Sequence, residues 1–263
     1  MKILVTNDDG IDAAGLKAVA SRLAAHNEVW VVAPDRNRSG VSHCITMDHP
    51  LYLQKKAENW YSLEGFPADC VITALRGNFL PGKPDIVISG INSDANLGSD
   101  VIYSGTCAGA RQASLYGIPG IAVSLCHKDQ HGGDGDSEYG ALADFVAANL
   151  VMLAGLCTVR FSDGSRKDDA PPGLPYFVNV NGMSGKSYQG VVLAGLSNRE
   201  YRDSVEIHTD SGGRQYSVFT GGTIVTHGDG TDDYSIVQRG YISLSVLRTE
   251  PVSCQGIEQQ FVC

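Results

Sequence analysis

The feature that most constrains the fold is an apolar run at residues 3–5 that ends in Asn7-Asp8-Asp9-Gly10. The segment that follows has apolar side chains at the i, i+3, i+4, i+7 spacing of one helix face, at Leu16, Val19, Ala20 and Leu23. A buried strand is therefore predicted to pass into a helix at Asp8 and Asp9. Ligands of open parallel sheets bind beyond the carboxyl ends of the strands, so both carboxylates are expected at that edge.

Asp8 and Asp9 place two carboxylates side by side, and each disfavours the ionisation of the other. A hard divalent cation relieves this repulsion, because such ions prefer oxygen ligands. The alternative is that one aspartate caps the following helix by accepting backbone N–H bonds. A cap requires only one carboxylate, so the pair favours a metal site.

Segments typical of buried strands alternate with segments typical of helices through most of the chain. Apolar runs that predict strands lie at residues 29–33, 85–92, 120–124 and 176–180. Helical patterns lie at residues 69–75, 107–116 and 139–154. This alternation predicts an α/β fold, with a Rossmann-like, mostly parallel sheet that is covered by helices on both faces.

The last third of the chain has a different pattern. Alternating or β-branched runs lie at residues 191–196, 215–226 and 241–247, with glycine pairs between them. These runs predict an antiparallel β-rich arm. We expect a Rossmann-like core over residues 1–180, followed over residues 181–263 by the arm and a C-terminal segment that serve oligomerisation and form no independent domain.

Two further strand ends carry oxygen ligands, at Ser39 and Asn92. If the strands are neighbours in one parallel sheet, these side chains can converge with Asp8 and Asp9 at one edge. Two carboxylates, a hydroxyl and an amide carbonyl suit Mg²⁺ or Mn²⁺ better than zinc. Taken alone, Ser39 and Asn92 are each also typical of an ordinary turn.

The segment Ser104-Gly105-Thr106 directly precedes the helical pattern at residues 107–116. Free N–H groups and the positive end of the helix dipole make such a position an anion site. A serine or threonine N-cap is the alternative. Because the segment follows Asn92 after a short loop, a phosphate-binding role is favoured.

Composition excludes some function classes. A net charge of -9 and a pI of about 5.1 argue against a nucleic-acid polymer as partner. Seven scattered cysteines without a C-x-x-C pair indicate reduced thiols and a cytoplasmic protein. The N-terminus has no signal-peptide pattern, and no apolar run approaches the roughly 20 residues that cross a membrane. The sequence also lacks a P-loop, a G-x-G-x-x-G and a G-x-S-x-G motif.

Four sequence blocks stand out together, namely Asn7–Gly10, Ala33–Gly40, Ser89–Asn92 and Tyr103–Thr106. In combination they resemble the SurE family of 5′/3′-nucleotidases. The match covers residues 1 to about 125 in the order and spacing of the family, and the segment 233–247 resembles its C-terminal block more loosely. The resemblance implies a metal-dependent phosphomonoesterase acting on nucleoside 5′- and 3′-monophosphates, with short polyphosphate as a further substrate.

The resemblance also implies roles for individual residues. One divalent ion per subunit, Mg²⁺ or Mn²⁺, would be held by Asp8, Asp9, Ser39 and Asn92, and Asp8 or Asp9 would act on the attacking water. The substrate phosphate would contact Asn96, Ser104, Gly105 and Thr106. A homodimer or homotetramer is also implied by the resemblance. The chain departs from the family pattern at Asp94, where a glycine is usual.

Two other functions remain open from the sequence. Asp8 could instead be the nucleophile of a covalent aspartyl-phosphate phosphatase. The chain could also be a non-catalytic nucleotide-binding module, with Asp94 as the change that removed activity.

Overall fold

The computed structural model describes residues 1–127, 136–159, 173–185 and 187–251. Its strands are β1 (Lys2–Thr6), β2 (Glu28–Pro34), β3 (Leu53–Ala57), β4 (Trp60–Leu63), β5 (Ile86–Asn92), β6 (Gly120–Cys126), β7 (Tyr176–Met183), β8 (Val191–Leu193), β9 (Asn198–Thr209), β10 (Gln215–His227) and β11 (Ile242–Arg248). Its helices are α1 (Ala14–Ala24), α2 (Pro67–Arg76), α3 (Asp100–Tyr103), α4 (Gly105–Leu115), α5 (Asp136–Ala148), α6 (Leu150–Leu156) and α7 (Asp233–Gln238).

A nine-stranded sheet forms the centre of the described structure, in the order β3-β4-β2-β1-β5-β6-β7-β11-β8. The strands from β4 to β7 run parallel to their neighbours, whereas β3 and β11 run antiparallel to β4 and β7. The predicted α/β fold with a mostly parallel sheet is therefore confirmed. Since β1 lies between β2 and β5, the ends of these three strands meet at one edge.

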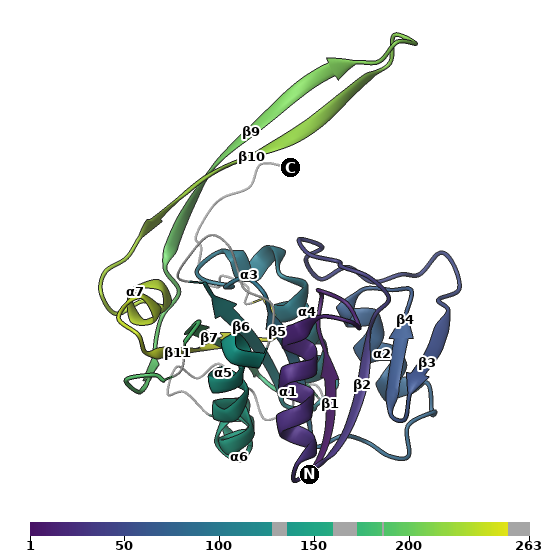
Figure 1. Ribbon diagram of the computed structural model, residues 1–263, viewed down its shortest axis with the longest axis vertical. Helices are drawn as coiled ribbons and strands as arrows, with labels where there is room; N and C mark the ends of the chain where they lie inside the picture. Colours follow the sequence, from purple (N-terminus) through teal and green to yellow (C-terminus); the bar gives the residue numbers. More distant parts are fainter. Residues whose placement is uncertain (128–135, 160–172, 186, 252–263) are drawn as a thin grey trace, which may run out of the picture.

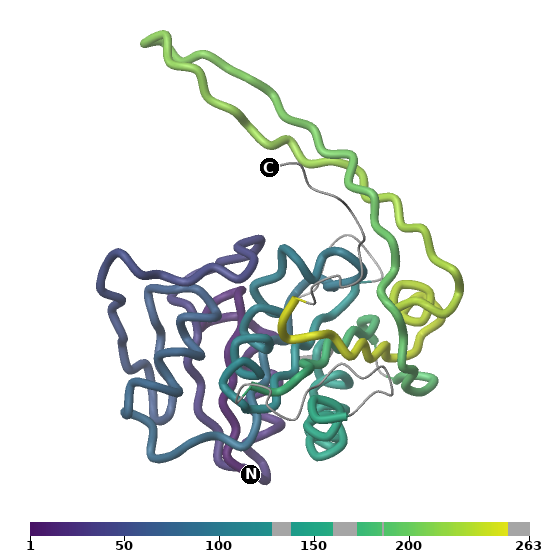
Figure 2. Tube along the Cα trace, turned by 180° about the vertical axis from the view of Figure 1, so that it is seen from behind, coloured from purple at the N-terminus to yellow at the C-terminus, as the bar shows by residue number. Residues whose placement is uncertain are grey.

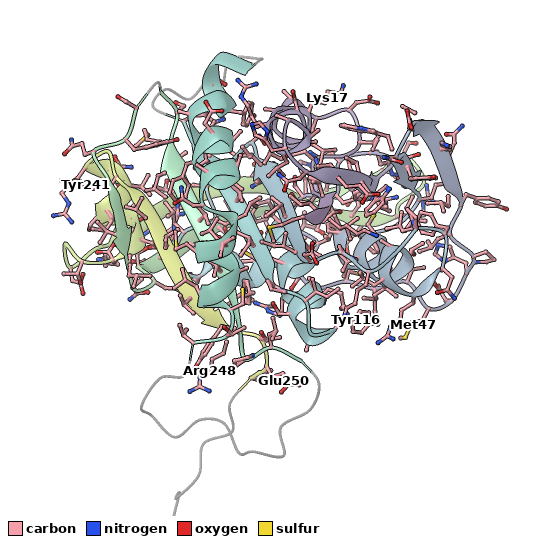
Figure 3. All side chains as sticks on the ribbon, turned by 90° about the horizontal axis from the view of Figure 1, so that it is seen from below. Lys17, Met47, Tyr116, Tyr241, Arg248 and Glu250 are labelled. Atoms are coloured by element: carbon pink, nitrogen blue, oxygen red, sulfur yellow. The ribbon has the colours of Figure 1, made fainter. Side chains whose placement is uncertain are left out.

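Both faces of the sheet are buried, which explains the continuous apolar runs in the strands. Along β1, Ile3 and Val5 pack against α1, α5 and α6, whereas Leu4 packs with Trp30 against α2 and the end of α4. Lys17 of α1 and Tyr116 at the end of α4 accordingly lie on opposite sides of the molecule (Figure 3). The helices thus form one layer on each side of the sheet (Figure 1).

The single helix expected over residues 139–154 is wrong, because the structure has two helices joined at a sharp bend. The segments 138–148 and 150–156 meet at 73°. The Asn149 side chain donates to the Phe145 carbonyl at 2.8 Å, and such amide-to-backbone bonds compete with helix continuation. In the described part of the chain, no single helix is long and apolar enough to cross a membrane, and only this bent pair passes that test when its parts are combined.

The arm contains fewer strands than the sequence pattern predicted. β9 and β10 form an antiparallel hairpin that extends away from the core (Figure 2). β8 and β11, which the pattern assigned to the arm, instead lie in the large sheet. The reason is burial, because Ile242 and Leu244 of β11 pack in the main core. Residues 252–263 of the predicted C-terminal segment lie outside the described residues.

Candidate functional site

The ends of β1, β2 and β5 open into a cavity of about 1140 Å³. The cavity walls include Asp8, Ser39, Asn92, Asn96 and Ser104. These residues come from four segments of the chain, since Asn92 and Asn96 belong to the end of β5 and the loop after it, and the sheet order brings the four segments together. Asp9, Gly105 and Thr106 lie beside the cavity residues without lining the cavity themselves.

The turn after β1 is stabilised by the side chain of Asn7. Asn7 donates from its amide to the Gly10 carbonyl at 2.9 Å and accepts the Gly10 N–H at 3.3 Å. Gly10 has a φ of 106°, a region that favours glycine. These bonds close the backbone turn that carries Asp8 and Asp9.

Asp8 is only 3% exposed and is bound to the first turn of α4. It accepts the Thr106 N–H at 3.1 Å and the Thr106 hydroxyl at 2.5 Å. Burial, with a smaller contribution from the charge of Asp9, raises the pKa of Asp8 to about 6 against the hydrogen bonds from Thr106. Asp8 therefore binds the first turn of α4 and does not cap α1, whose N-cap is Ala13 without a side-chain bond.

Asp9 is held by Ser93, a residue that the sequence did not single out. Its two oxygens accept the Ser93 N–H at 3.2 Å and the Ser93 hydroxyl at 3.1 Å. Burial raises the pKa of Asp9, and the nearby charge of Asp94 raises it further. Asp94 lines the same cavity, so it adds a negative charge to the wall of the space that a substrate would occupy.

Asn92 and Ser39 complete the oxygen set on the cavity wall. The Asn92 amide nitrogen donates to the Asp94 carbonyl at 2.5 Å, which leaves the Asn92 carbonyl oxygen available as a ligand. Ser39 is exposed, and its backbone N–H donates to Asn37 at 2.9 Å.

The residues around Asp8 fit a hard cation. No Lys, Arg or His of the described residues forms an ion pair with Asp8 or Asp9, and both carboxyls have raised pKa values. Within the described ranges, no group of three or more His, Cys, Asp or Glu residues could hold a metal. A cation here would therefore depend on the two carboxylates together with neutral oxygens, a set that suits Mg²⁺ or Mn²⁺.

At the beginning of α4, the backbone N–H groups of Thr106 and Cys107 already have hydrogen-bond acceptors. Ser104 acts as the N-cap and accepts the Cys107 N–H at 3.0 Å, as the capping alternative predicted. The Thr106 N–H donates to Asp8, so Thr106 contacts the carboxylate and not the cavity. Ser104 nevertheless lines the cavity, whereas Gly105 faces Asp8 and Pro67.

Asn96 is fixed by amides from two positions of β7. Asn179 and Asn181 donate to the Asn96 carbonyl at 2.8 and 3.0 Å, and Asn181 accepts the Asn96 N–H at 2.9 Å. The Asn96 side chain donates to Ser124 at 2.7 Å. Asn179 and Asn181 were not singled out from the sequence. Two amide side chains on the same face of a buried strand indicate a polar partner there, because buried amides need hydrogen bonds.

Comparison with known proteins points to one family. The sequence profile described as Survival protein SurE matches residues 3–203. The chain is 38% identical to "5′-nucleotidase SurE" of Geotalea uraniireducens, covering 95% of this chain and 94% of that protein. It is 41% identical to "5′-nucleotidase SurE" of Anaeromyxobacter dehalogenans, covering 82% and 76%.

A solved structure agrees with the sequence relatives. The SurE protein of Aquifex aeolicus superposes with a TM-score of 0.73 at 30% identity, covering 96% of this chain and 95% of that one. From the profile, the relatives and the fold together, this chain belongs to the SurE family.

Proposed function

We propose that this protein is a 5′-nucleotidase, a metal-dependent phosphomonoesterase that releases phosphate from nucleoside 5′-monophosphates and also from 3′-monophosphates. The observation that carries the proposal is the pair Asp8 and Asp9, which lies without a cationic partner among the described residues at the edge of a cavity large enough for a nucleotide. The relatives named 5′-nucleotidase support the same reaction.

The proposed cation ligands are Asp8, Asp9, Ser39 and Asn92, with one Mg²⁺ or Mn²⁺ per subunit. When bound there, the ion supplies Lewis acidity to the phosphate and to the attacking water. Asp8 is kept in place by its two bonds from Thr106, and Asp9 by its two bonds from Ser93. Asp9 is the proposed group that orients the water and accepts its proton.

The proposed phosphate subsite is formed by Asn96, Ser104, Gly105 and Thr106. The positive end of the α4 dipole opposes the phosphate charge, and Ser104 and Asn96 reach the same cavity from two elements. Gly105 has no side chain, which leaves room for Asp8 beside this subsite. Thr106 contributes through Asp8, to which its N–H and hydroxyl are bound.

A phosphate-release assay with AMP and GMP tests the proposal. We expect turnover with Mn²⁺ or Mg²⁺, loss of turnover with a chelator and recovery when the metal is added back. Turnover that resists the chelator would contradict metal dependence. No turnover with any of these nucleotides would instead favour the non-catalytic binding module.

Cation affinity is expected to fall steeply below about pH 6. The pKa of Asp8 is raised from 3.8 to about 6. The protonated Asp8 carboxyl therefore stabilises the metal-free fold below about pH 4, and this stabilisation is lost as the pH rises through about 6. The contribution is up to ~3 kcal/mol. A cation must displace that proton, so each pH unit below 6 lowers the affinity for Mn²⁺ about tenfold. Calorimetric titration with Mn²⁺ at about pH 5 and pH 7 measures this, and a pH-independent affinity would contradict Asp8 as a ligand.

Asp94→Asn is expected to lower the KM for AMP about threefold at low ionic strength, because a like charge is removed from the cavity wall. The effect should shrink in high salt, which screens exposed charges. It should be larger for tripolyphosphate, which carries more negative charge. The matched control is Asp12→Asn, whose side chain is 93% exposed and lies outside the cavity lining. Equal KM values for wild type and Asp94→Asn would show that this carboxylate does not face the substrate.

We also propose a homodimer or homotetramer that uses the β9–β10 arm. The hairpin leaves several large apolar side chains exposed, namely Val205, Ile207, Tyr216, Val218, Phe219 and Ile224. Burial of such a surface by another subunit is favourable. Light scattering of the purified protein tests this, since a mass of 27.9 kDa would indicate a monomer.

A further inference from the structure

The far end of the cavity is built around Asp100, at the start of α3. Its carboxylate accepts hydrogen bonds from the Arg199 guanidinium and from the Tyr201 hydroxyl, and it accepts the Leu97 N–H at 3.2 Å. Arg199 and Tyr201 belong to β9, so this network fastens the base of the arm to the wall of the cavity. The Tyr201 ring is therefore held in a fixed position.

Two tyrosine rings meet at this place. Tyr103 and Tyr201 are 5.7 Å apart between ring centroids with an interplanar angle of 82°, an edge-to-face pair. The Tyr103 backbone is fixed by a bond from the Ser42 N–H to its carbonyl at 2.8 Å. Tyr103 nevertheless remains 55% exposed. A large ring that is held in place yet uncovered inside a cavity wall offers a face to a ligand.

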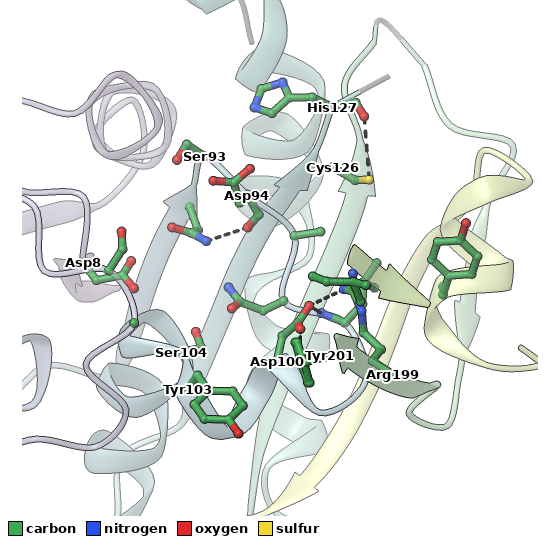
Figure 4. A pocket seen from close by; sticks show the side chains of 18 of the residues that line it. Asp8, Ser93, Asp94, Asp100, Tyr103, Ser104, Cys126, His127, Arg199 and Tyr201 are labelled. Atoms are coloured by element: carbon green, nitrogen blue, oxygen red, sulfur yellow. Dashed lines mark hydrogen bonds and ion pairs between the residues drawn. The ribbon is translucent and has the colours of Figure 1, made fainter. Parts of the chain in front are cut away.

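The cavity has two chemically different ends. Asp8 and Ser104 lie at one end, and Tyr201 and Arg199 lie at the other, with Tyr103 next to Ser104 (Figure 4). The arm adds Phe219 and Ile224 to the apolar lining. A phosphate fills only the polar end. The remaining space, within a total of about 1140 Å³, suits a drug-sized group with an apolar face.

We propose that Tyr103 and Tyr201 form the nucleobase subsite, in which the base of the substrate packs on the Tyr103 ring. The inference rests on the proposed nucleotidase function. It adds a binding site for the base of the nucleotide to the proposed phosphate subsite. The Tyr201 hydroxyl and the bonded Arg199 nitrogen are already committed to Asp100, so neither is free to read the edge of a base. Stacking accepts every base, because each base has a flat face. The subsite therefore distinguishes nucleotides from phosphate esters without a base, and purines bind better than pyrimidines because their faces are larger.

The test compares AMP with ribose 5-phosphate, which has the same phosphate and sugar but no base. In Tyr103→Ala, the ratio of kcat/KM for AMP to that for ribose 5-phosphate should fall about tenfold, mainly through the KM for AMP. Tyr103→Phe keeps the ring and should keep the wild-type ratio. The matched control is Tyr52→Ala, which removes an exposed tyrosine outside the cavity lining and should also keep the ratio.

An unchanged ratio in Tyr103→Ala, or equal losses on both substrates, would overturn the subsite. Calorimetric binding of adenosine separates this inference from the proposed reaction, because adenosine carries no phosphate and needs no turnover. Adenosine binding that is lost in Tyr103→Ala supports the subsite even if wild type releases no phosphate. Adenosine binding that is equal in wild type and Tyr103→Ala, or absent from both, refutes the subsite whatever the phosphate assay shows.

Discussion

Asp9→Asn is expected to lower kcat for AMP at least about 1000-fold while the fold stays intact. Asparagine has the shape of aspartate and can keep both contacts with Ser93, accepting its N–H and donating to its hydroxyl. The substitution therefore removes the charge and the proton acceptor but not the local hydrogen bonds. The measurement is kcat at saturating Mn²⁺, together with a thermal unfolding curve whose midpoint should stay within a few degrees of wild type.

The matched control for this prediction is Asp85→Asn. Asp85 is an exposed aspartate at the opposite end of the sheet, just before β5, where it accepts the Lys2 N–H at 2.7 Å. It should retain wild-type turnover. An Asp9→Asn variant with near-normal kcat would remove Asp9 from the reaction. A covalent adduct on Asp8 that is trapped with a phosphate mimic would support the covalent alternative instead.

The sheet and its ligand-binding edge could be predicted because their signals are local. Each buried strand appears in the sequence as an apolar run, and the polar residues that follow β1 and β5 mark the strand ends. Right-handed crossover connections then leave few ways to arrange parallel strands, so Asp8 and Asn92 were expected to meet. The structure places both on the wall of one cavity.

The partners of these residues could not be predicted, because they depend on pairings between distant segments. Thr106 was expected to contact phosphate, yet it donates to Asp8, which lies 98 positions earlier in the chain. Asp100 binds Arg199 and Tyr201 across about a hundred residues. No local periodicity encodes such contacts, since they follow from where the arm leaves the core.

The assignment of strands to sheets failed for a related reason. An alternating pattern shows that one face of a strand is buried but not which neighbour buries it. Residues 241–247 have the same kind of pattern as the hairpin strands, yet β11 pairs with β7 in the core. The pairing is decided by apolar side chains of β11, such as Leu244, that fit the existing core.

Gly105→Ala is expected to lower kcat for AMP about 100-fold and to weaken Mn²⁺ binding, which kinetics and calorimetric titration measure. A Cβ at this position would lie 2.9 Å from both Cβ and Oδ2 of Asp8 and 3.2 Å from the Pro67 ring. Asp8 is buried and held by Thr106, so it cannot move away without breaking those bonds. Gly105 does not have a positive φ, so the expected effect comes from this contact and not from backbone strain.

Two other helical glycines separate damage to the site from damage to packing. Gly109→Ala in the same helix would place a Cβ 2.7 Å from the Ser89 hydroxyl, away from Asp8, so it should cost stability with little loss of Mn²⁺ affinity. Gly155→Ala in α6 meets no atom within 4 Å and should raise stability by up to about 1 kcal/mol through helix propensity. If Gly105→Ala behaved like Gly109→Ala, with stability lost but Mn²⁺ affinity kept, the position of Asp8 would not control the cation site. A selective loss of Mn²⁺ affinity and turnover in Gly105→Ala alone would tie the reaction to the contact between the start of α4 and Asp8.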